Sequence, residues 1–259
     1  MLRYLHLLKE YMKFNLKALA VYDLDFYFAI FGMAIKNVLN IVALGFLFNL
    51  VPTIEGYTFS ELILTYSLAT LAFSIFRCFF INTLNIAYFI NKGTLDTILV
   101  KPVNPLFQLI NQRADEDSWG DLFVSLILVI SVDIKLDYPW YITIMFIFIS
   151  IFTSLVFLSL ALLGNVVTLF SNGLSDLAEV TFDFFELSKY PLSIYSETLK
   201  FVLTFILPIG WVASIPQKRI AEYHEWYWVL IIPIICIAFF IIIYQIWKLF
   251  LNNYQSTGS

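Results

Sequence analysis

Long apolar runs alternate with short polar segments along the whole chain. A helix rises 1.5 Å per residue, so about 20 mainly apolar residues are needed to cross about 30 Å of hydrocarbon. The pattern predicts six membrane spans that form one bundle over residues 1–259, with no separate second domain. The predicted spans cover residues 26–50, 61–85, 115–134, 140–170, 198–215 and 226–251.

Two of these spans are irregular. The third has an apolar centre of only residues 122–132, and it reaches full length only if its helix starts near the acidic residues 115–117. Carboxylates suit a helix N-terminus because of the macrodipole. Pro208 and Pro216 interrupt the fifth span. Backbone groups freed inside a bilayer need partners in protein or water, so we predict a broken or re-entrant outer element between spans five and six.

Residues 1–22 are predicted to form a separate amphipathic helix. Apolar residues recur there at helical spacing, and basic residues line the opposite side. Such a helix lies in the membrane interface, where anionic lipids attract its lysines, although the pattern also fits a helix that binds a soluble partner. The apolar positions are Leu2, Leu5, Leu8, Met12, Leu16 and Leu19, and the polar side carries Arg3, His6, Lys9, Lys13 and Lys17.

Composition places the chain firmly among integral membrane proteins. It is 61% hydrophobic and 13% charged, with a mean hydropathy of +0.85, whereas soluble domains are roughly 25% charged. We therefore predict an all-α integral membrane protein. Most Lys and Arg residues lie in the segments on the side of the two termini, and the other side has only Lys135, Lys218 and Arg219. This asymmetry predicts that both termini are cytoplasmic.

Signatures of catalysis are absent from the sequence. No Gly-rich turn ends in Gly-Lys-Ser/Thr, so we expect no nucleotide site in this chain, and no motif indicates a nucleic-acid partner. His6 and His224 lie on opposite predicted membrane faces and cannot build one centre. Cys78 and Cys236 each lie within an apolar run, as small core residues do. We predict no catalytic, cofactor-binding or metal-binding residue.

Two cations lie deep within predicted spans. Lys36 is ten residues into the first span and Arg77 is sixteen into the second. A charge at mid-bilayer costs roughly 2.5–3.5 kcal/mol on insertion scales, so it needs a reason. Both fall at similar depth and could line one polar path that contacts a substrate; alternatively each extends toward the interface or binds nearby carbonyls. The candidate translocation pathway consists of Lys36, Asn40, Arg77 and Asn82.

An acidic helical stripe follows the fourth span. Asp176, Glu179, Asp183 and Glu186 recur at spacings of three and four within residues 171–191. The spacing predicts a helix whose acidic side faces cytoplasmic solvent, with a dedicated binding site as the alternative.

The segment 91–110 reads "NKGTLDTILVKPVNPLFQLI" and carries two short helix patterns. Thr94 can cap the first, and Lys101-Pro102 stops it after about two turns. Asn104-Pro105 is a second start signal. Leu95, Ile98 and Leu99 share a face. Two helical turns beneath a bundle can bury little of their own apolar face, so we expect this face to be exposed and bound by another protein.

This segment resembles the coupling helix of the ABC-transporter type-2 permease family. The matching residues are Gly93, Thr94, Leu95, Asp96, Leu99, Pro102 and Val103, whereas "FINK" stands upstream where many relatives have an acidic residue. Residues 190–216 and the tail "NNYQSTGS" resemble a subgroup usually found as paired permeases with one ATPase. The resemblance covers nearly the whole chain.

The resemblance implies the membrane subunit of a bacterial plasma-membrane exporter. A second permease, paralogous or identical, would complete the translocation pathway. A cytosolic ATPase dimer would hold ATP and Mg and would dock on the coupling segment. The cargo would be amphiphilic or lipophilic, such as a drug, a peptide or a lipid. The implied ATPase-coupling residues are Gly93, Thr94, Leu95, Asp96, Ile98, Leu99, Lys101 and Pro102.

Two alternatives stay open. An ion-coupled secondary transporter or channel would act without an ATPase, but it needs intramembrane carboxylates or broken helices near mid-bilayer. The spans have few acidic residues away from their ends. A sensory or scaffold subunit would tolerate the loss of Lys36 and Arg77.

Overall fold

The computed structural model describes residues 3–4, 6–11, 13, 23–112, 115–171 and 177–254. These residues form helices and connecting turns, and no strand longer than an isolated bridge occurs among them. The elements are α2 (Asp23–Leu50), α3 (Phe59–Phe80), η1 (Ile81–Asn85), α4 (Ile86–Asn91), α5 (Thr94–Leu99), α6 (Pro105–Ile110), α7 (Glu116–Lys135), α8 (Trp140–Phe170), α9 (Val180–Ser188), η2 (Leu192–Ile194), α10 (Glu197–Phe201), η3 (Val202–Ile206), η4 (Pro208–Trp211), α11 (Ser214–Pro216), η5 (Gln217–Glu222) and α12 (Trp228–Asn252).

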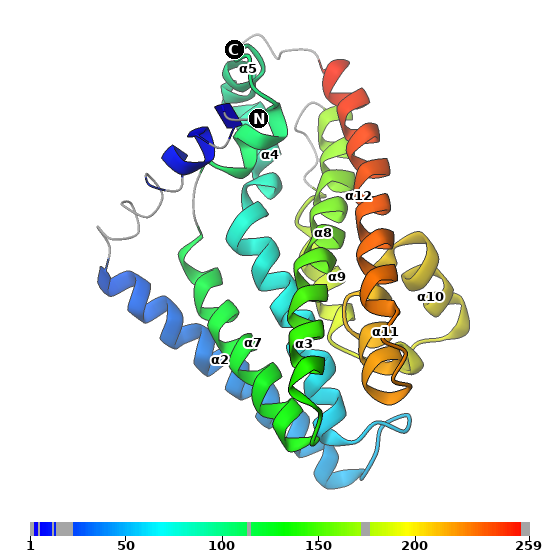
Figure 1. Ribbon diagram of the computed structural model, residues 1–259. Helices are drawn as coiled ribbons and strands as arrows, with labels where there is room; N and C mark the ends of the chain where they lie inside the picture. The colour runs from blue at the N-terminus through cyan, green and yellow to red at the C-terminus, as the bar shows by residue number, and fades with distance from the viewer. Residues whose placement is uncertain are drawn as a thin grey trace.

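Long helices run side by side in a single bundle (Figure 1). Four helical stretches among the described residues are long and apolar enough to cross a membrane: Ile30–Leu50, Phe59–Asn91, Trp140–Phe170 and Trp228–Asn252. They correspond to predicted spans one, two, four and six. The all-α prediction is therefore confirmed, and the prediction of six spans is confirmed only for these four.

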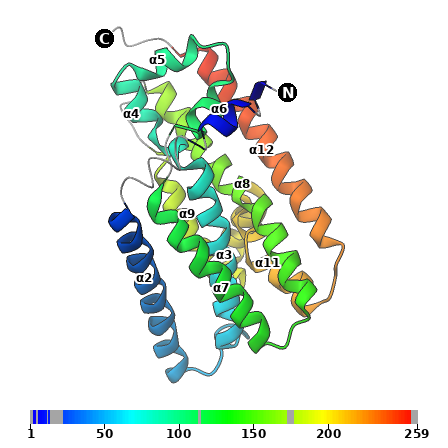
Figure 2. The same ribbon diagram turned by 60° about the vertical axis from the view of Figure 1, so that its left-hand side comes forward.

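The predicted third span forms α7, which begins within one residue of the expected position. It lies between α2 and α3 in both ribbon views (Figure 2) and packs against both. With its acidic residues, α7 is not apolar enough to count among the four helices named above. Its 20 residues are nevertheless long enough to cross a bilayer.

The predicted fifth span, residues 198–215, is not a continuous helix, in keeping with the interruption that its prolines predict. The chain leaves the helical region at Leu207, where φ is −117° and ψ is 95°, directly before Pro208. Proline lacks the N–H that the helix needs and restricts the residue before it, which explains the break. Pro216 does not break the chain but joins α11 to the π-helical turn η5. Residues 197–222 therefore form a series of short helical pieces, called the broken segment below.

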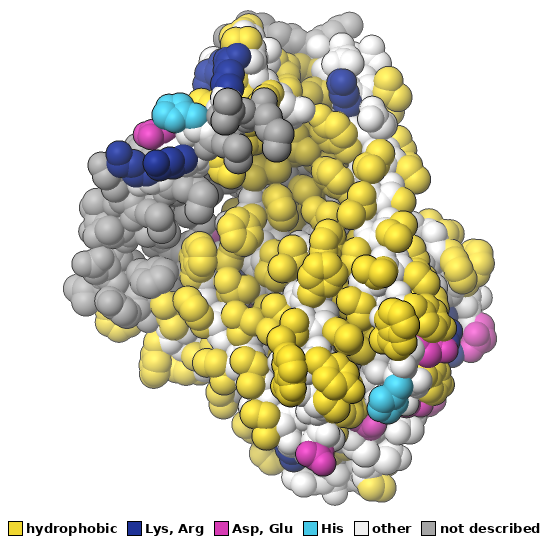
Figure 3. Space-filling model, viewed as in Figure 1, with side chains coloured by type: hydrophobic (Ala, Val, Ile, Leu, Met, Phe, Trp, Pro, Cys, Tyr) yellow, Lys and Arg dark blue, Asp and Glu magenta, His cyan; other side chains and the backbone are white. Residues whose placement is uncertain are grey.

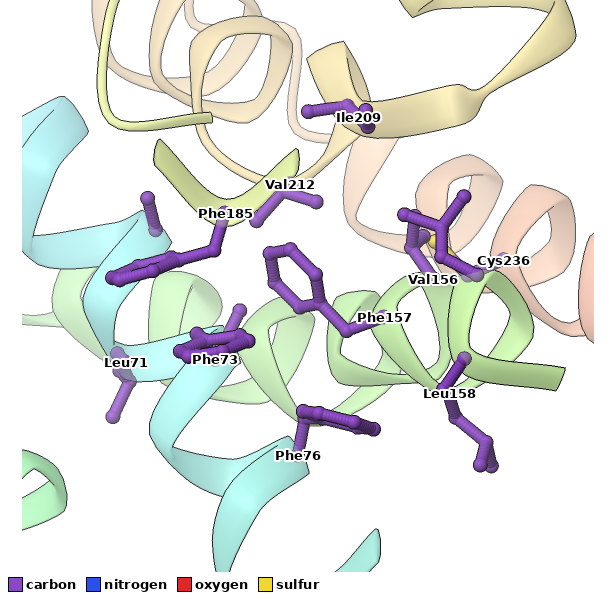
Figure 4. Packing of buried hydrophobic residues seen from close by; sticks show 14 of the residues in the cluster. Leu71, Phe73, Phe76, Val156, Phe157, Leu158, Phe185, Ile209, Val212 and Cys236 are labelled. Carbon is purple, nitrogen blue, oxygen red and sulfur yellow. The ribbon is translucent and has the colours of Figure 1, made fainter. Parts of the chain in front are cut away.

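The acidic side of the segment after α8 is exposed, as its spacing predicts, whereas the opposite side of α9 packs into the bundle core. Phe185 of α9 stacks on Phe73 of α3 with ring centroids 4.0 Å apart, and Phe157 of α8 meets Phe73 edge to face at 5.0 Å (Figure 4). Glu179, Asp183 and Glu186 are exposed on the other side, whereas Asp176 lies outside the described residues. The aromatic face of α9 thus decides its position in the bundle core.

Gly164 explains how α9 approaches α8 so closely. A Cβ on this residue would lie 2.6 Å from the Cα of Ala178, so only glycine fits without displacing backbone. Lys189 at the end of α9 is buried, with its ammonium 4.3 Å from the Phe185 ring and paired with Glu186. The distribution of charges predicts Lys189 in a loop on the side of the termini. This is wrong, because Lys189 is buried in the bundle at the end of α9.

The two ends of the bundle differ in what they carry. The described N-terminal residues and the end of α12 lie at the end that bears α5, where Tyr4 packs on Phe107 at 5.0 Å (Figure 1). The loop between α2 and α3 lies at the opposite end. A broad belt of hydrophobic side chains covers the surface between the two ends (Figure 3). The remaining residues of the predicted helix 1–22, including Leu2, Leu5, Met12, Lys17 and Leu19, are outside the described part.

Candidate functional site

The coupling segment, defined as residues 91–110, forms two short helices joined by a turn. Gly93 has φ +67°, a left-handed conformation that glycine adopts without strain, and α5 starts directly after it. Gly93 is therefore the N-cap residue in place of Thr94, whose hydroxyl donates to the carbonyl of Phe89 at 3.2 Å. The helix ends at Leu99, before Lys101-Pro102, as predicted.

The apolar face of α5 points into the protein, so the prediction that it is exposed is wrong. Leu95 is fully buried, Ile98 is buried and Leu99 packs against the same core. The outward face instead presents Thr97, Val100, Lys101 and Pro102. Val100 has 83% of its surface exposed although it directly follows the buried face of α5. The bundle itself provides the apolar surface that two isolated helical turns lack.

The second short helix locks the segment to the bundle. Asn104 caps α6 by accepting from the N–H of Phe107 at 3.2 Å, and Pro105 is its first residue, both as predicted. The Asn104 amide also donates to the Tyr244 hydroxyl of α12 at 2.7 Å. The buried Gln108 amide donates to the carbonyls of Ile98 and Val103, which fixes the turn between α5 and α6.

Asn82 connects the same segment to the long helix that precedes it. Its amide donates to the carbonyl of Ile110, at the end of α6, with a distance of 3.0 Å. Asn82 had been assigned to a translocation pathway together with Arg77, but it lies in η1 and contacts the coupling segment. The segment is thereby hydrogen-bonded to η1, which follows α3, and to α12 through Asn104.

A polar cluster lies where α2, α3 and α7 meet. Polar side chains from the three helices form an uninterrupted set of ion pairs and hydrogen bonds. Its members are Lys36, Asn37, Asn40, Tyr66, Arg77, Asp115 and Asp121.

Asp121 of α7 is the centre of the polar cluster. Its Oδ2 lies 3.1 Å from Lys36 Nζ and 3.2 Å from Arg77 Nη1, and its Oδ1 accepts from the Asn37 amide at 2.8 Å. Arg77 Nη2 pairs in addition with Asp115 at 2.7 Å. Lys36 and Arg77 thus lie close together, because they share one carboxylate. Neither has to reach the interface to find a partner.

Hydrogen bonds extend the cluster to a second layer of residues. The Tyr66 hydroxyl donates to Asn37 Oδ1 at 2.7 Å and accepts from the Asn40 amide at 3.2 Å. The side chain of Lys36 is 47% exposed, whereas those of Arg77 and Asp121 are largely buried. The cluster therefore presents one ammonium group to the surface of α2 while its other charges stay inside.

Gly120 allows the acidic helix to reach α2. A Cβ at this position would lie 2.8 Å from the Cα of Ile30, a backbone atom that cannot rotate away. The glycine directly precedes Asp121, so the closest approach of the two helices brings the carboxylate to Lys36 and Asn37. The sequence analysis does not single out Asp121, which directly precedes the apolar centre of the predicted third span. A Gly-Asp pair six residues into a predicted span was the available signal.

No group of three or more His, Cys, Asp or Glu side chains among the described residues could hold a metal ion. Cys78 and Cys236 are both buried and free, in agreement with their prediction as core residues. The ion pairs and hydrogen bonds of the polar cluster hold α2, α3 and α7 together, and Lys36 is its most exposed charged side chain.

Comparison with known sequences assigns the family. A sequence profile described as ABC-2 family transporter protein matches residues 34–258, which include the polar cluster and the coupling segment. Neither the curated proteins nor the solved structures contain a significant match. The profile agrees with the resemblance found in residues 91–110 and with the long apolar helices of the fold. This chain therefore belongs to the ABC-2 transporter family and is a membrane permease.

Proposed function

We propose that the chain is a membrane-spanning subunit of an ATP-driven exporter, with a cytosolic ATPase dimer that docks on it through the coupling segment. The single observation that carries the proposal is the construction of α5. Its apolar face is anchored in the bundle by Leu95 and Ile98, and its outward face is left available at Val100 and Lys101. A partner that moves this face moves a helix already connected to α3 and α12.

The force path follows from the hydrogen bonds. Displacement of α6 acts on η1 through Asn82 and on α12 through Asn104 and Tyr244. Because these elements continue into the longest apolar helices, a small shift at the coupling segment is transmitted along the bundle. ATP binding and hydrolysis would occur on the partner, which agrees with the missing phosphate-binding motif.

A second permease, paralogous or identical, completes the proposed pathway. The apolar part of α2 is little buried within this chain, so one side of it is available to a neighbour. Lys36 lies on this helix with its ammonium half exposed. We place the path of an amphiphilic or lipophilic substrate beside α2, with Lys36 contacting the polar group of the substrate. The coupling-segment end is the cytoplasmic end in this proposal, and the membrane is the plasma membrane.

The docking role can be tested with a matched pair of surface variants. Val100→Asp places a carboxylate on the outward face of α5, and Val51→Asp makes the same change on an exposed valine at the other end of the bundle. We expect Val100→Asp to abolish co-purification of an ATP-hydrolysing subunit from native membranes, because an unpaired charge inside an interface must be desolvated. Val51→Asp should retain it.

Leu95→Asp separates docking from folding. Leu95 is fully buried, so this variant should lower the melting temperature, whereas Val100→Asp should not. An ATPase retained by Val100→Asp at the level of the unaltered protein would contradict docking through α5. Export that runs on an ion gradient without nucleotide would favour the alternative of a secondary transporter.

A further inference from the structure

A cavity of about 610 Å³ lies in the broken segment at the end opposite the coupling segment. Its walls come from residues 192–228 together with Tyr57 of the loop between α2 and α3. The volume is within the range of about 300–1,000 Å³ that small-molecule sites occupy. Three cationic side chains line it, Lys200, Lys218 and Arg219, and no Asp or Glu is among the described residues that line it.

The cations are held in different ways. Arg219 pairs with Glu225 at 3.1 Å, and its guanidinium carbon lies 5.2 Å from the Trp228 ring centroid, which fixes its position. Lys200 pairs with Glu197 at 2.6 Å. Lys218 is exposed and forms no ion pair with a described residue; its ammonium lies 5.7 Å from the Tyr223 ring. The cavity therefore has one cation without a carboxylate partner beside two that are preorganised.

Neutral donors complete the polar part of the wall. The hydroxyl of Ser193 is buried and has no hydrogen-bond partner among the described residues, which is costly for a polar group unless a ligand satisfies it. Burial raises the pKa of Tyr57, so its hydroxyl remains a neutral donor at physiological pH. Every charged group on the wall is positive, and these hydroxyls add hydrogen-bond donors to it.

The surroundings of the cavity are apolar. Phe205 and Trp211 line it, and the ring of Phe201 lies 5.2 Å from that of Phe205, with both phenylalanines strongly exposed. Tryptophan and tyrosine gather at the level of lipid headgroups, and Trp140, Trp226 and Tyr227 mark that level at the starts of α8 and α12. Charged side chains are visible at the edge of the molecule where α10 lies, next to the hydrophobic belt (Figure 3). An occupant would thus meet cations at one end and lipid-facing aromatic rings at the other.

We propose that this cavity binds the phosphate-bearing headgroup of an anionic amphiphile, with the headgroup between Lys218 and Arg219 and the acyl chains along Phe201 and Phe205. Charge complementarity and the aromatic rim select this ligand class. The site is separate from the coupling segment and from the polar cluster, so binding requires no ATPase. The occupant reaches it from the bilayer.

Native mass spectrometry of the purified full chain tests the proposal, with phosphatidylglycerol, phosphatidylcholine and inorganic phosphate as probes. We expect phosphatidylglycerol to bind more tightly than phosphatidylcholine. Lys218→Gln should weaken phosphatidylglycerol binding about five-fold, the effect of about 1 kcal/mol for one cation near a membrane surface. Lys135→Gln removes the same charge at the same end but outside the cavity, and it should leave the affinity unchanged.

Ser193→Ala is a second variant, since it removes the buried hydroxyl without changing charge, and it should also weaken binding. Equal affinity for the two lipids, or equal losses in Lys218→Gln and Lys135→Gln, would overturn the proposal. Tight binding of inorganic phosphate without a preference for phosphatidylglycerol would overturn the amphiphile and leave a site for a free anion. Loss of the ATPase in Val100→Asp bears only on the coupling segment, so the two proposals fail independently.

Discussion

Individual side chains in the polar cluster have unequal structural weight. Asp121 accepts from three groups on two helices, whereas Lys36 contributes a single contact and is half exposed. Removal of one partner of a buried ion pair leaves the other charge without compensation, while a solvent-exposed pair contributes little. The carboxylate is therefore the residue on which the junction of α2, α3 and α7 depends.

Asp121→Asn should lower the free energy of unfolding by on the order of 3 kcal/mol, because Arg77 and Lys36 lose a shared charged acceptor. Lys36→Met should cost about 1 kcal/mol or less. Denaturant titration in mixed micelles measures both. Asp137→Asn, at an exposed position of the same chain, is the control and should be neutral. A cost for Lys36→Met as large as that for Asp121→Asn would refute the central place of the carboxylate.

At the scale of helices, local signals predicted the ends of elements well and their neighbours poorly. Asn104-Pro105 and Lys101-Pro102 are capping and stop signals read within a few residues, and both lie where the helices begin and end. The burial of Leu95 could not be predicted, because it depends on the bundle residues that pack against α5. The acidic residues of α9 gave no indication that its other face lies in the core, because the burial of Phe185 depends on Phe73 of α3 lying opposite it.

Gly120→Ala should destabilise the contact between α7 and α2 by roughly 1–3 kcal/mol, because the new methyl group meets backbone at 2.8 Å. Gly32→Ala is the matched change on α2, where nothing lies within 4 Å. This second variant should be neutral or gain roughly 0.5–1 kcal/mol from helix propensity. Melting temperatures of the purified variants compare the two. Equal shifts in the same direction would contradict close packing at Gly120.

At the scale of the whole molecule, the bundle has two chemically different ends. The coupling segment, Tyr4 and the end of α12 form one, with Lys92, Lys101 and Lys248 nearby in the sequence. The broken segment and its cavity form the other end of the bundle, and Lys200 lies at this end. Lys92, Lys101 and Lys248 still favour the first end as the cytoplasmic one, although Lys189 and Lys200 do not lie at that end.

A pair of cysteine variants tests this orientation. Thr97→Cys lies on the exposed face of α5, and Thr53→Cys lies in the exposed loop between α2 and α3. The native cysteines are buried, so background labelling should be low. A membrane-impermeant maleimide should label Thr53→Cys in intact cells and Thr97→Cys only after permeabilisation. The reverse pattern would invert the proposed topology.

The composition of the polar cluster has an electrical consequence. Lys36 and Arg77 carry two positive charges, and Asp115 and Asp121 carry two negative charges, all within one connected group. Each elementary charge that moves across the membrane field exchanges about 2.3 kcal/mol with it per 100 mV. A group of zero net charge that shifts as one body exchanges almost nothing. Helix movements that keep these ion pairs intact would therefore be insensitive to the membrane voltage.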